Sequence, residues 1–135
     1  ANLFNRDGGP EPPVGISVPQ AMYDDFVKIS EPIQKIRPDY PFEVKVREPR
    51  KRPTRMGGTD ASVFAIEGVP TLGFTTEDFK GYDFDYGEIW HTERDLYTKN
   101  IPEYQEHTAT VTAIIALGVA NLDKQLSREG LYTEE

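Results

Sequence analysis

The stretch that decides the fold spans residues 57–74 and reads GGTDASVFAIEGVPTLGF. Thr59 or Asp60 is placed to cap a short helix, because both side chains accept hydrogen bonds from the first free amides of a helix. Gly68 indicates where that helix ends, since glycine adopts the left-handed conformation without a side-chain penalty. The apolar run over 69–74 then has the length and composition of a buried strand. The stretch therefore predicts a helix followed directly by a strand.

Further elements are predicted upstream of this stretch. Residues 1–4 resemble the end of a strand, and residues 11–15 have the Pro/Gly composition of a loop. Ser17 is placed to cap a helix, because apolar residues then recur at three- and four-residue spacing. A break in that helix is expected at Pro32, which lacks an amide hydrogen. Residues 42–46 alternate apolar and polar side chains, as a half-buried strand does.

Downstream, residues 75–90 form a long loop with little periodicity, and a last helix starts near Asn100. Its apolar stripe extends to Leu126, which implies roughly seven helical turns. The alternation of strands and helices predicts an α/β fold with a partial, mainly parallel sheet of about three strands, flanking helices and a long C-terminal helix. Residues 1–135 are expected to form a single, incomplete α/β domain.

So thin a sheet leaves one edge without a partner strand. Either further strands of the same sheet belong to protein outside this chain, or a second copy covers the edge. The second possibility is a homodimer formed through the exposed sheet edge.

Composition narrows the possible functions. A net charge of −8 argues against a nucleic-acid binder, whose affinity would come from Lys and Arg neutralising phosphates. The chain has no cysteine, and therefore neither disulfides nor thiolate metal ligands. No stretch approaches the ~20 apolar residues of a membrane span, and residues 1–10 lack a signal-peptide pattern. One basic run is typical of a solvated loop, or else of a rim that attracts anionic substrate termini: Lys45, Arg47, Arg50, Lys51, Arg52 and Arg55.

His91 is the first candidate for chemistry. It follows a loop rich in carboxylates and aromatic rings, among them Tyr86 and Trp90. Asp95 stands four residues later, within reach of the second ring nitrogen if the segment turns. A metal-bound imidazole needs such an acceptor to hold its orientation. His107, in contrast, lies on the apolar stripe of the last helix and is expected to be packed there.

Two aspartates are further candidates. Asp7 precedes Gly8-Gly9 at the end of a predicted strand, where it either ligates a cation or forms an Asx turn. Asp60 follows Gly57-Gly58-Thr59, where it either caps the helix or offers its carboxylate to a substrate. The sequence contains neither a phosphate-binding loop nor an H-E-x-x-H zinc motif.

The order of these motifs resembles the C-terminal half of the co-catalytic zinc exopeptidases, which include leucyl aminopeptidases, carboxypeptidase Q and glutamate carboxypeptidases. The residues that carry the resemblance are Gly-Gly-Thr-Asp, the apolar segment ending in Gly-Val-Pro-Thr-Leu-Gly-Phe, and His-Thr-Glu-Arg-Asp. The resemblance implies that His91 and Asp7 ligate two different zinc ions and that Asp95 orients the His91 ring. It also implies that Asp60 lies near the substrate and that the loop with Tyr86 and Trp90 lines the substrate pocket.

The chain departs from that family at Ala61, where a histidine is usual, and the resemblance places the other metal ligands and the glutamate base upstream of Ala1. It therefore implies a C-terminal fragment of a zinc-dependent exopeptidase, most readily an aminopeptidase, with two zinc ions in the full-length enzyme, a peptide substrate and no catalytic residue in this chain. The missing N-terminal half of the domain is the expected partner, and the location implied by the resemblance is periplasmic or secreted. The alternative is a non-catalytic, peptidase-like binding module.

Overall fold

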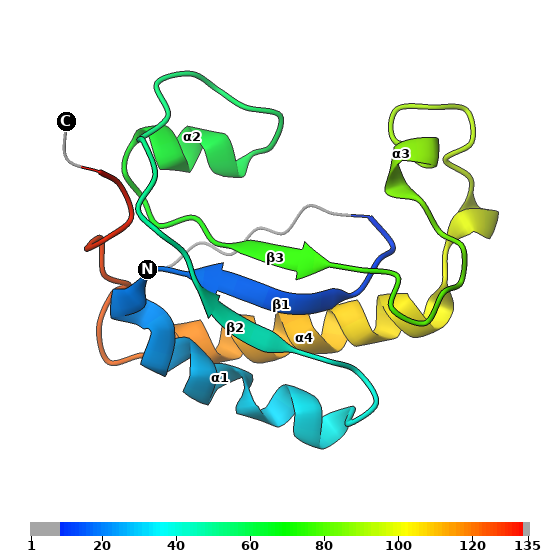
Figure 1. Cartoon of the computed structure of the whole chain (residues 1–135), viewed down its shortest axis with the longest axis horizontal. Coiled ribbons are helices and arrows are strands. Elements are labelled where there is room, and N and C mark those ends of the chain that lie inside the picture. Colours follow the sequence, from blue (N-terminus) through cyan, green and yellow to red (C-terminus); the bar gives the residue numbers. More distant parts are fainter. Residues whose placement is uncertain (1–8, 134–135) are drawn as a thin grey trace.

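The computed structural model describes residues 9–133. At its centre lies a three-stranded sheet in the order β2-β1-β3 (Figure 1). Its strands are β1 (Pro13–Val18), β2 (Glu43–Val46) and β3 (Gly73–Thr76). β2 runs parallel to β1, whereas β3 runs antiparallel to it. The α/β class and the number of strands are as predicted, but the sheet is mixed rather than mainly parallel.

The two connections explain this difference. A parallel pair needs a crossover that carries the chain back along the sheet, and the 14-residue helix α1 (Tyr23–Ile36) does this between β1 and β2. The connection from β2 to β3 contains only the six-residue helix α2 (Ala61–Ile66), which is about 9 Å long. α2 lies near the end of the sheet where β2 finishes, so the chain enters β3 there and runs back (Figure 1).

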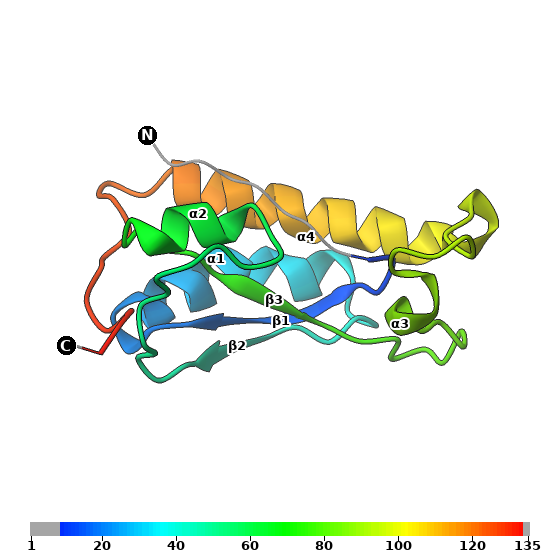
Figure 2. The ribbon, with the colours of Figure 1, turned by 90° about the horizontal axis from the view of Figure 1, so that it is seen from above.

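Helices α1 and α4 (Pro102–Ala120) lie side by side and cover one face of the sheet (Figures 1 and 2). Gly118 makes their close approach possible, because a Cβ atom at this position would lie 2.3 Å from Cγ2 of Ile29. The core between the layers consists of fully or nearly fully buried apolar side chains, each contributing roughly 1.5–3 kcal/mol: Ile16, Val18, Val44, Met22, Phe26, Ile33, Val111, Ile115 and Val119.

The central strand β1 is where the prediction was wrong. Residues 11–15 were expected to form a loop and Ser17 to cap a helix, but Ser17 lies inside the strand and pairs with Gly73. Burial explains the outcome, because Ile16 and Val18 enter the core and β1 hydrogen-bonds to a strand on each side. Gly15 suits this position, since a Cβ atom there would lie 2.6 Å from the carbonyl oxygen of Glu43 on β2.

Helix α1 follows the strand after a single 3₁₀ turn, η1 (Gln20–Met22). The break expected at Pro32 does not occur, and the helix continues to its end at Ile36. Pro32 removes the hydrogen bond to the carbonyl of Lys28, and both residues are exposed, so water can satisfy that carbonyl.

Residues 57–74 form a helix and then enter a strand, as predicted, but the strand is not buried. Gly73, Thr75 and Thr76 are exposed, because β3 lies at an edge of the sheet. Asp60 occupies the N-cap position of α2, but its side chain does not make the predicted capping hydrogen bond, and its backbone is already helical. Gly68 follows the helix with a left-handed φ of 70°. β3 starts later than predicted, at Gly73, because the Val69 amide still hydrogen-bonds to the Phe64 carbonyl and so belongs to the helix end.

The last helix is shorter than predicted. α4 has 19 residues, about five turns, and ends at Ala120 with Asn121 as its C-cap. Leu126 lies beyond the helix and still packs against the core, which is why the apolar pattern runs past the helix end. None of the helices in the described residues is long and apolar enough to cross a membrane. The strand predicted over residues 1–4 lies outside the described part of the chain.

Candidate functional site

The candidate site lies in the long connection between β3 and α4, which projects beyond the sheet at one end of the molecule (Figures 1 and 2). This connection contains the four-residue helix α3 (Tyr86–Ile89) and a 3₁₀ turn, η2 (Tyr97–Lys99). Its first half is held against α4 by polar contacts. Its second half, from α3 to η2, carries His91 and is exposed apart from Ile89.

The Asp78 carboxylate organises the start of the connection. It accepts hydrogen bonds from the amides of Tyr82 (3.0 Å) and Phe84 (3.1 Å) and from the Tyr104 hydroxyl (2.5 Å). The Tyr104 oxygen in turn accepts a hydrogen bond from the Lys80 amide (3.0 Å). The Tyr104 bond, followed by the backbone amides, holds the pKa of Asp78 below its usual value, while burial and Asp78 raise the pKa of Tyr104 to about 12. A charged acceptor thus fixes the loop to α4.

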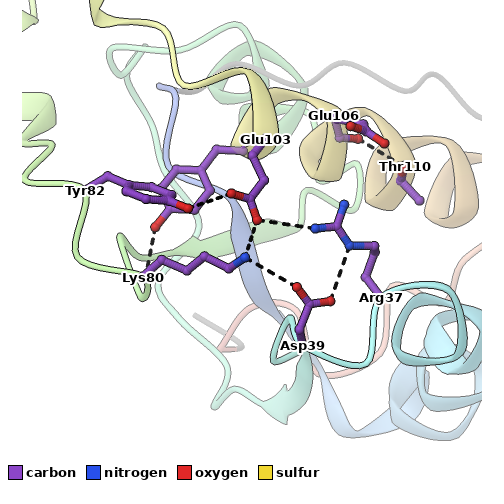
Figure 3. Close-up of polar contacts among 8 residues, drawn as sticks. Arg37, Asp39, Lys80, Tyr82, Glu103, Glu106 and Thr110 are labelled. Carbon is purple, nitrogen blue, oxygen red and sulfur yellow. Dashed lines mark hydrogen bonds and ion pairs between the residues drawn. The ribbon is translucent and has the colours of Figure 1, made fainter.

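A second carboxylate, Glu103 in the first turn of α4, completes this attachment (Figure 3). It accepts hydrogen bonds from Lys80 Nζ, from the Tyr82 hydroxyl (2.6 Å) and from Arg37 Nη2 (3.4 Å). Asp39 bridges the same two cations, with 3.4 Å to Arg37 and 3.4 Å to Lys80. Lys80, followed by the tyrosine hydroxyls, lowers the pKa of Glu103 to about 2. The two carboxylates and the two cations compensate one another, and we call this group the Glu103 cluster.

His107 lies beneath the Glu103 cluster and is fully buried, as the sequence predicted. Its ring stacks on Tyr40 with 3.9 Å between the ring centroids, and neither ring nitrogen has a hydrogen-bond partner within the described residues. Arg37 lies 4.4 Å and Lys80 4.7 Å from the centre of the Tyr40 ring. Burial, and then the charge of Arg37, lowers the pKa of His107 to about 4. This imidazole is a neutral packing group rather than a ligand.

His91 has the opposite environment. Helix α3 starts at Asp85, whose carboxylate caps it by accepting a hydrogen bond from the Gly87 amide (2.8 Å), and ends at Ile89. His91 follows with a left-handed φ of 56°, which few non-glycine residues adopt. Its exposed ring lies against Trp90, with 4.4 Å between the ring centroids. The turn therefore exposes the imidazole to solvent beside an exposed aromatic ring.

The other predicted site residues are placed as follows. Tyr86 and Trp90 flank α3 and are both exposed. Asp95 is exposed too, and its amide bonds to the Thr92 carbonyl (3.3 Å); within residues 9–133 its carboxylate makes no hydrogen bond or ion pair with His91. Asp60 occupies the N-cap position of α2, which lies over the other end of the sheet from α3 (Figure 1). Asp7 lies outside the described residues.

A zinc ion fits these residues only in part. His91 has an exposed imidazole without a competing protein hydrogen bond, which suits one zinc ligand. In the described part of the chain, however, no three His, Asp or Glu side chains gather closely enough to hold a metal ion. A pocket of about 170 Å³ lies beside α3, between residues 82–89 and 98–101, and its acidic lining includes Asp83, Asp85 and Glu88.

The sequence did not identify the Glu103 cluster. One signal was present, since Lys80 is the only cation between residues 75 and 90. Comparison with known proteins adds no assignment, because no protein family, no curated protein and no solved structure matches the chain.

Proposed function

We propose that this chain serves as the C-terminal part of a zinc-dependent exopeptidase, in which His91 supplies one imidazole ligand to a zinc ion. The order of the motifs in residues 57–74 and 91–95 motivates the proposal. The observation that carries it is the left-handed, exposed His91 at the end of a loop whose base is fixed to α4.

The backbone of His91 is the informative detail. A left-handed conformation costs a non-glycine residue roughly 1–2 kcal/mol. Such strain is found where surrounding structure imposes it, often at binding and catalytic sites. Here it turns the imidazole out of the α3 ladder, which continues as far as the Trp90 amide. An imidazole that serves only packing can lie in a regular helix, as the buried His107 does.

The other residues receive supporting roles in this proposal. Asp95 orients the second ring nitrogen of His91, and the exposed rings of Tyr86 and Trp90 contact the terminal side chain of a peptide. Asp7 is proposed to ligate the second zinc ion. Asp60, predicted to lie near the substrate, is left out of this site, because α2 lies at the other end of the sheet from α3. When bound, the two zinc ions supply a water acidified enough to act as a hydrolytic nucleophile. The general base and the remaining ligands are proposed to come from protein outside this chain.

The sheet offers a place for that missing part. β2 and β3 are both edge strands within the described residues, and Glu43, Lys45 and Val46 on β2 are exposed. An unpaired edge presents free backbone amides and carbonyls to another strand. We propose that the N-terminal part of the parent protein pairs here, with a second copy of the chain as the other candidate partner, in a periplasmic or secreted protein.

Calorimetric titration of the chain with zinc tests the assignment of His91. We expect weak binding that His91→Ala abolishes, and no peptide hydrolysis by the isolated chain. Tyr97→Ala is a matched control, because Tyr97 is 92% exposed in the same loop and is assigned no role. Tight stoichiometric binding that survives His91→Ala would refute the assignment, and an absence of zinc binding would favour the non-catalytic binding module.

A further inference from the structure

Two arginines lie beside the C-terminal end of α2, which is at the opposite end of the sheet from α3 (Figure 1). Arg52 donates from Nε (2.7 Å) and Nη2 to the carbonyl of Ile66, and a Cβ atom on Gly68 would lie 3.5 Å from its Cζ atom. The same Cβ position is 3.8 Å from Nη1 of Arg128. Two guanidinium groups therefore lie close to Gly68, beside the helix end.

The other two arginines approach from β2 and its following loop. The backbone of Arg50 pairs with Leu131 and Thr133 of the C-terminal segment, and its Nη2 donates to Thr71 Oγ1 (3.2 Å). Tyr132, between those partners, donates its hydroxyl to the Ala65 carbonyl of α2 (3.2 Å). This contact connects the two halves of the group, which we call the arginine cluster: Arg47, Arg50, Arg52 and Arg128.

Arg47 is the unusual member. It follows the last residue of β2, and its amide donates to the Val18 carbonyl (2.8 Å), so the strand pairing fixes its position. Its Nε and Nη2 atoms are buried, and within residues 9–133 they have no hydrogen-bond acceptor. Burial and the nearby charge of Arg50 lower the pKa of Arg47, although arginine stays protonated. Buried cationic donors without an acceptor cost free energy until an acceptor is supplied.

No carboxylate of the described residues supplies an acceptor for the buried Arg47 donors. The ion pairs over residues 9–133 join Lys35, Arg37, Lys45 and Lys80 to acidic partners, and none includes a member of the arginine cluster. This is unexpected in a chain with 23 acidic and 15 basic residues. Four guanidinium groups, with two Arg47 donors that have no acceptor among residues 9–133, match a multiply charged oxyanion in charge and in hydrogen-bond donors.

We propose that the arginine cluster binds a phosphate group, with Arg47 and Arg50 as hydrogen-bond donors and Arg52 and Arg128 adding positive charge. The phosphate group is either free or part of a small phosphorylated ligand. The proposal is independent of the exopeptidase assignment, because the cluster lies at the opposite end of the sheet from His91.

Arginine side-chain NMR tests this directly in the full chain. Inorganic phosphate should shift the Nε–H resonance of Arg47 in a saturable manner, whereas sodium chloride at the same ionic strength should not. Arg37 is the internal control, since Asp39 already accepts its Nε–H. Glycerol phosphate, compared with inorganic phosphate, shows whether the site prefers a phosphate group carried by a larger molecule.

Variants complete the test. Arg47→Met and Arg50→Gln should each weaken phosphate binding about tenfold or more, as expected for the loss of a charge-assisted hydrogen bond. Arg50 is exposed, so Arg50→Gln should fold even if Arg47→Met does not. Lys28→Gln, an exposed charge removed from α1, and His91→Ala should bind phosphate like the wild type. Equal effects of phosphate and chloride, or unchanged affinity in Arg50→Gln, would overturn the proposal.

Discussion

Cationic side chains at the two ends of the sheet differ in whether acidic partners compensate them. In the Glu103 cluster, Arg37 and Lys80 face Glu103 and Asp39, and the Tyr82 hydroxyl adds a further hydrogen bond to Glu103 (Figure 3). In the arginine cluster, no carboxylate within the described residues forms an ion pair with the guanidinium groups. The first arrangement is complete and fixes a loop in place. The second leaves two buried donors of Arg47 without an acceptor among residues 9–133, and this difference motivates the proposed phosphate site.

The same contrast distinguishes the two histidines. His107 is buried next to the Glu103 cluster and serves packing, whereas His91 is exposed at the end of the loop that the cluster holds. Rigid attachment at the base and exposure at the tip are what a protein needs in order to present one ligand to a metal. The stability of the loop base and the chemistry of its tip are therefore separate properties, and variants should separate them.

The largest expected effect concerns His107. Its pKa is about 4 in the folded chain against 6.5 in the unfolded chain, so the unfolded state binds more protons between these values. Stability should therefore be full above pH 6.5 and fall by about 3 kcal/mol as the pH decreases to about 4. Arg37, Lys80 and Asp39 are the charged groups around this ring, and the two cations oppose its protonation.

Urea unfolding at a series of pH values measures this loss. His107→Phe keeps an aromatic ring against Tyr40 and cannot bind a proton, so its stability should change much less between pH 6.5 and 4. An identical pH dependence in both proteins would show that another group is responsible.

The next effect concerns the attachment of the loop. Tyr104→Phe removes a buried hydroxyl that donates to Asp78 and accepts from the Lys80 amide. The free energy of unfolding should fall by about 1.5–3 kcal/mol, the range for hydrogen bonds to charged groups. Tyr97→Phe makes the same chemical change at a residue that is 92% exposed and should have no measurable effect in the same urea titration. Equal stability of the two variants would contradict the role given to Asp78.

A smaller effect on stability is expected in the arginine cluster. Its sign should be opposite to the usual result of removing a charge. Arg47→Met replaces a half-buried cation that lacks an acceptor, so stability without phosphate should stay the same or rise by about 1 kcal/mol. Glu103→Gln should instead destabilise the chain, because Lys80 and Arg37 lose one of the two carboxylates that they share. Thermal melting at low ionic strength compares the two variants, and a loss of stability in Arg47→Met would mean that its charge is already compensated.

The smallest effect is expected at His91. His91→Gly relieves the left-handed strain while adding flexibility to the unfolded chain, so stability should rise by about 1 kcal/mol or less. Asp83→Gly is the comparison, since Asp83 has a similar φ of 58°. Both variants should melt slightly above the wild type, and a marked loss of stability in His91→Gly would mean that its side chain supports the fold rather than a ligand.

Local patterns predicted part of the local structure. The start of α2 near Asp60, the helix end at Gly68 and the burial of His107 all depend on residues close in sequence or on a regular helical stripe. β1 was missed because Pro12, Pro13 and Gly15 have a loop composition, and only pairing with strands on both sides makes that segment a strand.

The attachment of the candidate site was beyond the reach of local patterns. The contact of Lys80 with Glu103 spans 23 residues and that of Arg37 with Glu103 spans 66. Such pairs follow from the packing of α1 against α4, which no short motif encodes. His91 itself was found because the acidic, aromatic loop before it is a local signal.

The most direct test of the central claim is NMR observation of the two imidazoles during zinc addition. The chain contains only His91 and His107, so each serves as the reference for the other. The proposed role of His91 predicts that zinc shifts and broadens the His91 ring signals while those of the buried His107 stay unchanged. Zinc that leaves His91 unaffected, or that perturbs both rings equally, would contradict it.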